Sequence, residues 1–522
     1  MYLRQVDVVG FRGINRLSIN LHPNMVLIGE NAWGKSSLLD ALRLILNPEK
    51  VLYQFQSSDF HIHYENEKIT KLRHLTLLFT FSESNQKESN ESYNYLYRPI
   101  FARHQDGFER IYLRVTGDWR ADNSVITEYS FLNENGDPIE TENTESLVFT
   151  LISRHPVYRF RDARLQRHYY NLHPLPLPKT DSDLQKEIIA TGLLLQYYLL
   201  DQQLIDIPVK DISLLWARVH SLCQRLQQDS SRQLAHQLFA HLSGLFSSHE
   251  KIRFGKFTRP IILLEDLEAR LHPRMMAIAW EMAGYLPIQR ITTTNSVELL
   301  SQVELRSICR LVRYTDRTQS FQLQRRDLSK EDLRRLTFHV HYNRSLALFA
   351  RMWILVEGET EVWILSELAK LLNINLEMEG IRIVEFAQSG LRPLIKYVKA
   401  MGIEWYVLTD GDEAGKKYTE VVRTMLPEGE TMSQRITTLP KVDIEHFFYS
   451  EGFDDIFIRL AHWIPMKSNP VSRIIQKAIQ RTSKPDLAIA ISDEIEKRGS
   501  QSIPILFKRL FSKVLLLART QQ

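Results

Sequence analysis

The chain has 522 residues, of which 44% are hydrophobic and 25% charged, a length and composition typical of two or three globular domains. Its 66 Lys and Arg residues exceed its 62 Asp and Glu residues only slightly, giving a formal net charge of +4, so any surface that binds nucleic acid must be local. The two isolated cysteines argue against a disulfide framework, and the lack of a long apolar run argues against a membrane partner; we therefore expect a cytoplasmic protein.

A complete phosphate-binding loop lies near the N-terminus. The apolar run 25–28 predicts a buried strand, and apolar residues recur at helical spacing from Leu38 to Ile45. Between them stands the sequence Gly29-Glu30-Asn31-Ala32-Trp33-Gly34-Lys35-Ser36. Its glycines let backbone amides face phosphate oxygens, while Lys35 reaches the terminal phosphates and Ser36 coordinates Mg²⁺. The predicted nucleotide-binding residues are Gly29, Asn31, Gly34, Lys35, Ser36 and Ser37.

The region after this loop is predicted to be β-rich over 70–155 and helical over about 182–248. The helical part, an insertion placed at about 175–250, is either a dimerisation element or a buried bundle. Between the two, the stretch 154–167 has five arginines, which either contact nucleic-acid phosphates or form a solvated or ATP-sensing face.

Two later strands end in polar residues. The apolar run 261–264 is followed by Glu265 and Asp266, which we expect to hold the metal of a bound nucleotide and to polarise the attacking water, respectively. The alternative is a strand that ends in solvated acids. The short strand 290–294 is followed by Asn295, a second polar group expected beside the nucleotide.

Together these blocks resemble the ABC-type ATPase heads of chromosome-maintenance and recombination proteins. The resemblance implies ATP as the ligand and a homo-oligomer, a dimer or higher, because such heads share nucleotide sites between subunits. This chain has Asp266 where the family usually has glutamate and Asn295 where it usually has histidine, which leaves the rate of ATP hydrolysis open. The family's signature loop is not evident, since Leu242-Ser243-Gly244 lies in an apolar pattern that favours a core helix.

Residues 352–418 alternate strand and helix three times, which is typical of a parallel sheet. In such sheets the functional groups gather at the carboxyl ends of the strands, and Ser389 follows one of them. Carboxylates suit hard cations, so the acids at the other ends predict a site for one or two Mg²⁺ or Mn²⁺ ions. Glu357 is expected to be a metal ligand or a general base. The predicted ligands are Glu357, Glu361, Asp410 and Asp412.

The sequences Val356-Glu357-Gly358-Glu359-Thr360-Glu361 and Asp410-Gly411-Asp412 resemble the Toprim fold. An ATPase block followed by a Toprim block resembles the OLD (overcoming lysogenisation defect) family of ATP-dependent nucleases, and in particular its enterobacterial ATP-dependent endonuclease subgroup, the YbjD-like proteins. The resemblance continues through Asp443-Ile444-Glu445-His446-Phe447 and Ser483-Lys484-Pro485-Asp486. It implies a further metal-binding acid, Glu445, and an active-site lysine, Lys484.

The predicted fold class is therefore α/β. An ABC-type P-loop ATPase head with the helical insertion occupies 1–340, and a Toprim domain with a parallel sheet and a C-terminal helical extension occupies 341–522. The predicted function is that of an ATP-binding, metal-dependent DNA endonuclease with Glu357, Asp410, Asp412, Lys484 and Asp266 as catalytic residues. The alternatives are a nucleotide-dependent, clamp-like DNA-binding protein and a DNA-activated ATPase that does not cut. Phage defence and DNA repair are both compatible with these functions.

Overall fold

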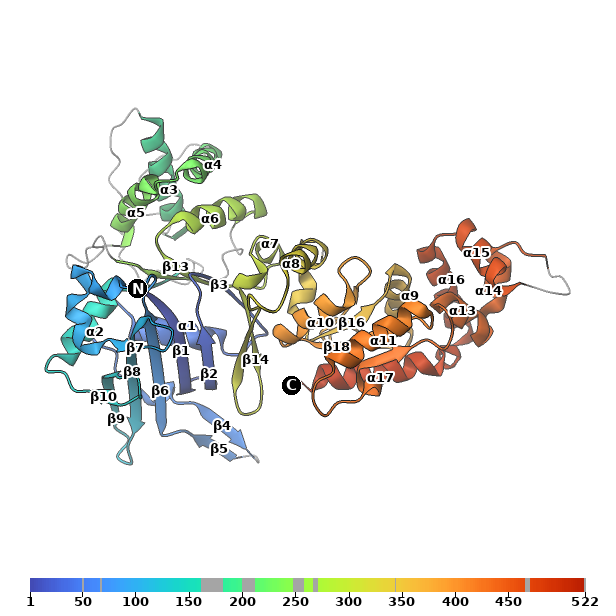
Figure 1. The fold of residues 1–522 in the computed structure, drawn as a ribbon, viewed down its shortest axis with the longest axis horizontal. Helices are drawn as coiled ribbons and strands as arrows, with labels where there is room; N and C mark the ends of the chain where they lie inside the picture. Colours follow the sequence, from blue (N-terminus) through green and yellow to red (C-terminus); the bar gives the residue numbers. More distant parts are fainter. Residues whose placement is uncertain are drawn as a thin grey trace. The chain divides into compact units, whose positions relative to one another are not determined.

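A computed structural model describes residues 1–48, 51–65, 68–160, 182–199, 212–246, 258–265, 271–342, 344–464 and 470–520. The chain forms two compact units, Met1–Ser320 and Phe321–Gln522 (Figure 1). Within these ranges no helix combines the length and the apolar character needed to cross a lipid bilayer.

The N-terminal unit contains an antiparallel sheet whose strands run in the order β10-β9-β8-β6-β1-β2, with β7 beside β8. Its long strands bury alternate side chains against the core, as expected for a sheet with one face packed and the other toward solvent. The strands are β1 (Tyr2–Phe11), β2 (Ile14–Asn20), β6 (His74–Ser82), β7 (Ala102–Arg103), β8 (Glu109–Trp119), β9 (Val125–Leu132) and β10 (Pro138–Ile139).

A second sheet of the same unit positions the phosphate-binding loop. Its order is β11-β12-β13-β3-β14-β15, and the first five strands pair in parallel. Helix α1 (Lys35–Ile45) follows β3 directly after the loop and buries Leu38, Leu39 and Leu42 in the core that the two sheets share. The strands are β3 (Asn24–Ile28), β11 (Val157–Phe160), β12 (Ile261–Glu265), β13 (Gln289–Thr293), β14 (Ile308–Arg313) and β15 (Thr318–Gln322).

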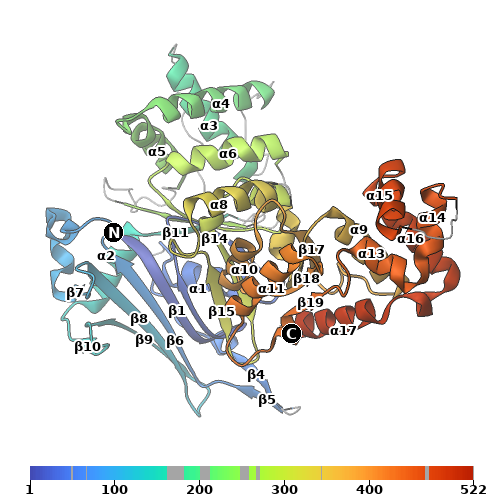
Figure 2. The same cartoon turned by 45° about the vertical axis from the view of Figure 1, so that its right-hand side comes forward.

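The described residues of the predicted helical insertion are helical, as expected, and include α3 (Asp183–Leu199), α4 (Ile212–Gln228) and α5 (Gln233–Phe246). They pack with α6 (Pro273–Tyr285) around a core of their own that includes Trp216, Leu222, Leu238 and Ile278 (Figure 2). Leu242, Ser243 and Gly244 lie inside α5, which confirms the core-helix interpretation of this segment.

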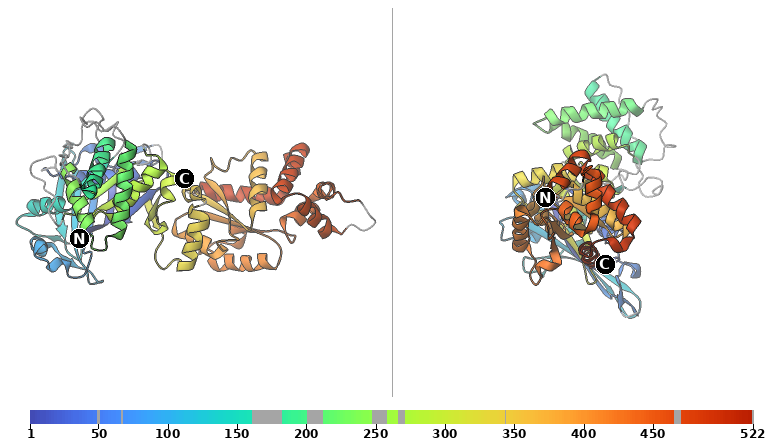
Figure 3. Two further views of the ribbon diagram at one scale, coloured as in Figure 1. Left: turned by 90° about the horizontal axis from the view of Figure 1, so that it is seen from above. Right: turned by 90° about the vertical axis from the view of Figure 1, so that its right-hand side faces the viewer.

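The C-terminal unit is built on a parallel sheet of order β17-β16-β18-β19, as the alternating pattern predicted. Helices connect consecutive strands, and the helices after β19 pack with the sheet in one continuous hydrophobic core (Figure 3). The elements are β16 (Met352–Val356), α9 (Glu359–Leu371), β17 (Ile381–Glu385), α10 (Leu391–Ala400), β18 (Glu404–Thr409), α11 (Glu413–Met425), α12 (Met432–Arg435), β19 (Ile436–Thr438), α13 (Ile444–Phe448), α14 (Asp454–Leu460), α15 (Val471–Arg481), α16 (Lys484–Arg498) and α17 (Ile505–Arg519).

Shorter elements complete the two units. They are β4 (Ile62–Glu65), β5 (Lys68–Lys71), α2 (Thr144–Arg154), α7 (Val297–Leu300) and α8 (Lys330–Leu336).

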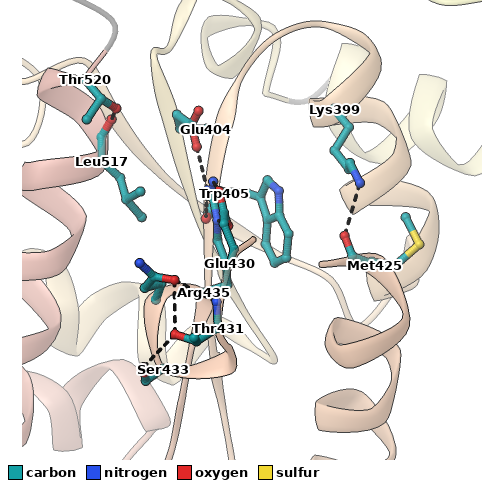
Figure 4. Close-up of polar contacts among 11 residues, drawn as sticks. Lys399, Glu404, Trp405, Met425, Glu430, Thr431, Ser433, Arg435, Leu517 and Thr520 are labelled. Atoms are coloured by element: carbon teal, nitrogen blue, oxygen red, sulfur yellow. Dashed lines mark hydrogen bonds and ion pairs between the residues drawn. The ribbon is translucent and has the colours of Figure 1, made fainter. Parts of the chain in front are cut away.

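A buried arginine fixes β19 to the sheet. Arg435, which is 4% exposed, donates from Nη1 to Glu404 at 2.5 Å and from Nη2 to Glu430 at 2.5 Å, and its guanidinium lies 5.2 Å from the centre of the Trp405 ring (Figure 4). Two carboxylates therefore compensate one buried cation, which is the condition under which a charge is tolerated in a core.

Candidate functional sites

The phosphate-binding loop has the backbone that its sequence requires. Gly29 and Gly34 have positive φ angles of 148° and 98°, and a side chain at Gly29 would meet the Leu311 carbonyl oxygen at 2.7 Å. Lys35 Nζ donates to the carbonyl oxygens of Gly29 and of Glu30, the latter at 3.0 Å. The lysine is thus held over the loop by the loop's own carbonyl oxygens, and its role in binding phosphate stays a prediction.

The remaining predicted loop residues differ in exposure. Asn31 and Ser36 are exposed, while Ser37 Oγ accepts a hydrogen bond from the Gly13 amide at 3.2 Å. Ser37 therefore ties the loop to the turn between β1 and β2. Its role as a nucleotide ligand stays a prediction.

The parallel register brings the other predicted head residues to the same edge. Glu265 pairs in register with Thr293, and Thr293 pairs with Leu27, two residues before the loop begins. Asn295 is exposed two residues beyond Thr293. Asp266 and the arginines at 161, 164 and 167 lie outside the described residues.

An ion-pair network that is buried at Arg159 and Glu265 and partly exposed at Arg12 and Asp40 links these parts. Arg159 on β11 donates from Nη2 to Glu265 Oε1 at 2.6 Å, and its Nη1 bonds Asp40 on α1. Asp40 also accepts from Arg12 at 2.5 Å, and Arg12 Nε bonds Asp59 at 3.0 Å. Sequence reasoning missed this role, because only the strand register shows that Arg159 lies beside the strand that ends in Glu265.

The other described arginine of the stretch 154–167 also bonds within the head. Arg154 Nη1 donates to Asn94 Oδ1 at 3.1 Å, and Nη2 donates to the Tyr93 carbonyl oxygen. Neither Arg154 nor Arg159 matches the exposed phosphate contact that the sequence left open.

The predicted acids of the C-terminal unit follow the carboxyl ends of its strands. Glu357 follows β16 and Asp410 follows β18, and both strands pair in parallel, so the two acids lie at one edge of the sheet. Glu361 lies on the first turn of α9, and its Oε2 accepts from the Gly358 amide at 3.0 Å. Asp412 caps α11 by accepting from the Gly415 amide at 2.7 Å. Glu361 and Asp412 thus fix helix ends and keep a second carboxylate oxygen each for another partner.

Two glycines set the backbone between these acids. A side chain at Gly411 would lie 2.3 Å from the Lys441 carbonyl oxygen, and one at Gly415 would lie 1.9 Å from the Asp410 carbonyl oxygen. The Gly411 amide also donates to that Lys441 oxygen at 3.0 Å. The Asp410-Gly411-Asp412 turn therefore packs directly against the segment that leads from β19 to α13.

Burial and neighbouring acids at this edge raise the pKa values of Asp410 and Glu357. Burial and the charges of Glu361 and Glu357 raise the pKa of Asp410 to about 8. Burial and the charges of Asp412 and Glu361 raise the pKa of Glu357, while Lys484 opposes the shift. The shifts therefore follow from burial and from like charge on acids that come from different elements.

The two residues assigned by resemblance also lie near each other. Lys484 Nζ, at the first turn of α16, is 3.9 Å from Glu445 Oε1 on α13. Burial and the charge of Asp443 raise the pKa of Glu445, and Lys484 opposes this. His446 beside it is held by Asp443, with 2.6 Å between Nδ1 and Oδ1. Asp443 and His446 are polar neighbours of this site that sequence reasoning did not single out.

The chemistry of these residues fits a hard divalent cation. Glu357 Oε2 and Glu445 Oε1 are buried without a hydrogen-bond partner, a costly state for a carboxylate that a cation would relieve. Across the described ranges, however, no three His, Cys, Asp or Glu side chains are grouped so that they could hold a metal ion in this arrangement. The donor atoms are suitable, then, but their side chains do not converge on one point. Ser389 Oγ, 1% exposed, is likewise buried without a hydrogen-bond partner.

Comparison with known families matches both units. Residues 1–347 match the family described as protein of unknown function (DUF2813). Residues 348–412 match the family described as overcoming lysogenization defect protein-like, TOPRIM domain.

Individual proteins are similar to this chain over very different shares of its length. Uncharacterized protein YbjD of Escherichia coli (strain K12) is 41% identical over 99% of this chain and 99% of its own. Endonuclease GajA of Bacillus cereus (strain VD045) is 29% identical over 92 residues, which are 18% of this chain and 15% of that protein. The solved C-terminal region of the Xanthomonas campestris pv. campestris OLD protein is 16% identical, covering 33% of this chain and 94% of that one with a TM-score of 0.26.

Proposed function

Because this chain belongs to the DUF2813 family and joins its ATPase head to an OLD-like Toprim domain, we propose that it is a metal-dependent DNA endonuclease regulated by nucleotide binding. The observation that carries the proposal is the set of acids at one edge of the Toprim sheet, with Lys484 beside Glu445. The endonuclease name of the partial relative GajA supports the same reaction class.

A divalent cation held by Glu357, Asp410, Asp412 and Glu445 would lower the pKa of a water molecule and neutralise charge on the scissile phosphate. We assign the remaining roles to residues of the protein. Glu357 carries a buried oxygen without a hydrogen-bond partner, and besides holding the cation it is suited to accept the proton of the attacking water. Lys484 is suited to bind a phosphate oxygen as negative charge builds on it. Asp412 and Gly415 orient the Asp410 turn by their hydrogen bond.

The N-terminal head is proposed to bind ATP with Mg²⁺ through Lys35 and Ser36, and Glu265 to contact that metal. Its ABC-type architecture supports a homodimer in which two heads share nucleotide. Lys35 now bonds loop carbonyl oxygens, so a bound phosphate would replace these acceptors.

The test is cleavage of supercoiled plasmid in Mg²⁺ or Mn²⁺, with and without ATP. The wild type should nick or linearise the plasmid, and the double variant Asp410→Ala, Asp412→Ala should not. A matched control, Glu367→Ala with Glu420→Ala, removes two carboxylates of α9 and α11 that pair with exposed Lys370 and Arg423, and it should cut normally.

The outcomes separate the candidate functions. Equal cleavage by the wild type and the Asp410 and Asp412 variant would refute the proposed metal site. A second candidate is a DNA-binding ATPase that does not cut; it is favoured by the finding that the acids are not grouped as a metal-ligand set in the described part of the chain. For that candidate, DNA should stimulate phosphate release, Lys35→Ala should abolish the release, and the plasmid should stay intact.

A further inference from the structure

Helix α15 (Val471–Arg481) has one apolar and one basic face. Ile474, Ile475 and Ala478 are buried in the core of the C-terminal unit. Arg473, Lys477 and Arg481 recur at spacings of four residues and so lie along one side of the helix, beside the buried face; Arg473 and Arg481 are exposed and Lys477 is half-buried. The packing of α15 accounts for its apolar residues and for the contact of Lys477 with the Trp463 ring, and it leaves Arg473 and Arg481 exposed.

These three cations have no carboxylate partner among the described residues. In the described part of the chain none of them forms an ion pair, and the sequence of α15 contains no acidic residue. Some exposed cations of other helices pair with carboxylates: Lys370 with Glu367 at 2.7 Å, Arg423 with Glu420 at 2.8 Å, and Arg519 with Glu379. The positive charge of α15 is therefore not neutralised within the unit. Lys477 Nζ lies 5.3 Å from the centre of the Trp463 ring, a contact that keeps its charge.

Helix α15 lies near the elements that carry Glu445 and Lys484. Its Ser472 Oγ lies 3.3 Å from His446 Nε2, and His446 follows Glu445 directly. Two residues separate the end of α15 from Lys484, the first residue of α16. The basic face thus begins beside α13 and continues toward the lysine proposed to contact the scissile phosphate.

We infer that the basic face of α15 is a docking surface for the sugar-phosphate backbone of duplex DNA that reaches the Toprim edge. The inference rests on the proposed nuclease function and adds the surface that holds the substrate. From Arg473 to Arg481 the helix rises about 12 Å, which spans about three phosphates of one strand at 3.4 Å of helix axis each. The face carries three cations, so the charges match in number. Backbone contacts of this kind give affinity without sequence preference.

The test measures binding of a fluorescent 30-base-pair duplex of mixed sequence as a function of salt. All proteins carry Asp410→Ala and Asp412→Ala and are kept in EDTA, so that hydrolysis does not enter the measurement. Arg473→Gln, Lys477→Gln and Arg481→Gln are combined in one variant. The charge-matched control combines Lys370→Gln, Arg423→Gln and Arg519→Gln, which removes three cations that already have carboxylate partners.

Loss of three phosphate contacts should lower the slope of log K against log salt by about 2.7. A fourfold rise in salt should then weaken binding by the parent about 40-fold more than binding by the α15 variant. The control should keep the parental slope. A third variant, with lysine at 473 and 481 and arginine at 477, keeps the charges and should also keep the slope, which separates lost charge from a disturbed fold.

An unchanged slope in the α15 variant, or an equal fall in the control, would overturn the docking surface and leave the plasmid test of the nuclease unaffected. A slope change seen only with single-stranded DNA would overturn the assignment to duplex. The reverse case, normal binding through α15 but no cleavage by the intact wild type, would retain the surface and reject the nuclease.

Discussion

Arg159 and Glu265 form a buried ion pair, with 2.6 Å between Nη2 and Oε1 and 7% side-chain exposure for each residue. The two come from adjacent parallel strands and are 106 residues apart in sequence. The same guanidinium holds Asp40 on the helix after the phosphate-binding loop. One arginine therefore joins the proposed metal-binding acid of the head to the helix that presents Lys35.

Replacing Arg159 with methionine should destabilise the N-terminal unit by about 3–5 kcal/mol, because Glu265 would remain buried without its cation. The matched control is Arg335→Met, which breaks an exposed pair with Glu331 and should cost less than about 1 kcal/mol. Urea unfolding of both variants gives the two free energies. Similar losses of unfolding free energy in the two variants would show that the Arg159 ion pairs contribute little to stability.

Lys484→Gln should slow plasmid cleavage by about 100-fold to 1000-fold, because the charge on the phosphate in the transition state would lose its cation. Affinity for DNA in EDTA should change little, since a single contact is removed. Lys497→Gln, near the far end of the same helix, is the control and should cut at the wild-type rate. Equal rates of plasmid cleavage by the two variants would show that Lys484 does not take part in cleavage.

Gly415→Ala should destabilise the C-terminal unit by about 1–3 kcal/mol and abolish cleavage, because the new methyl group would collide with the Asp410 carbonyl oxygen. For Gly284→Ala we expect the opposite effect on stability. A side chain at Gly284 in α6 would meet no atom within 4 Å, so alanine should stabilise that helix by about 0.5–1 kcal/mol. Thermal unfolding and plasmid cleavage of the two variants test both statements, and a stable, active Gly415→Ala protein would contradict the first.

His155 should make the protein sensitive to acid. Burial lowers the pKa of His155 to about 3, whereas in the unfolded chain it is about 6.5. The unfolded state therefore binds an extra proton between these values, and stability present above pH 6.5 is lost by about 1.4 kcal/mol per unit as pH falls toward 3. From pH 7 to 4.5, urea unfolding of His155→Phe should show about 2.7 kcal/mol less loss than the wild type. The exposed His236→Gln control should follow the wild type, and parallel curves for all three proteins would disprove the assignment.

The strand and helix beside the phosphate-binding loop and the central strands of the Toprim sheet could be predicted from local sequence patterns. The strand β3, the loop and α1 were predicted because a short apolar run, two glycines and a helical repeat stand in succession. The strands β16, β17 and β18 were predicted because each apolar run ends at a polar residue. Both patterns are local, and local patterns can be read without knowing which strands are neighbours.

The contacts between distant residues could not be predicted in this way. Pairing of Arg159 with Glu265 depends on β11 lying beside β12, and strand order is set by packing of the whole unit. The proximity of Lys484 and Glu445 was implied by family resemblance alone, since no spacing rule connects α16 to α13. Glu361 is a different case: its position three residues after Gly358 is the spacing of a helix cap, a signal that the sequence did contain.

The anchoring of β19 by Arg435 bears on self-association. This strand is the outermost strand on one side of the Toprim sheet. It is only three residues long, so it offers few free backbone groups to a strand from another molecule. The arginine immediately before it is fixed by Glu404 and Glu430, so ion pairs within the unit hold the residue at which the strand begins. A charge cluster far from the strand ends that carry the acids thereby limits edge-to-edge aggregation through this side of the sheet.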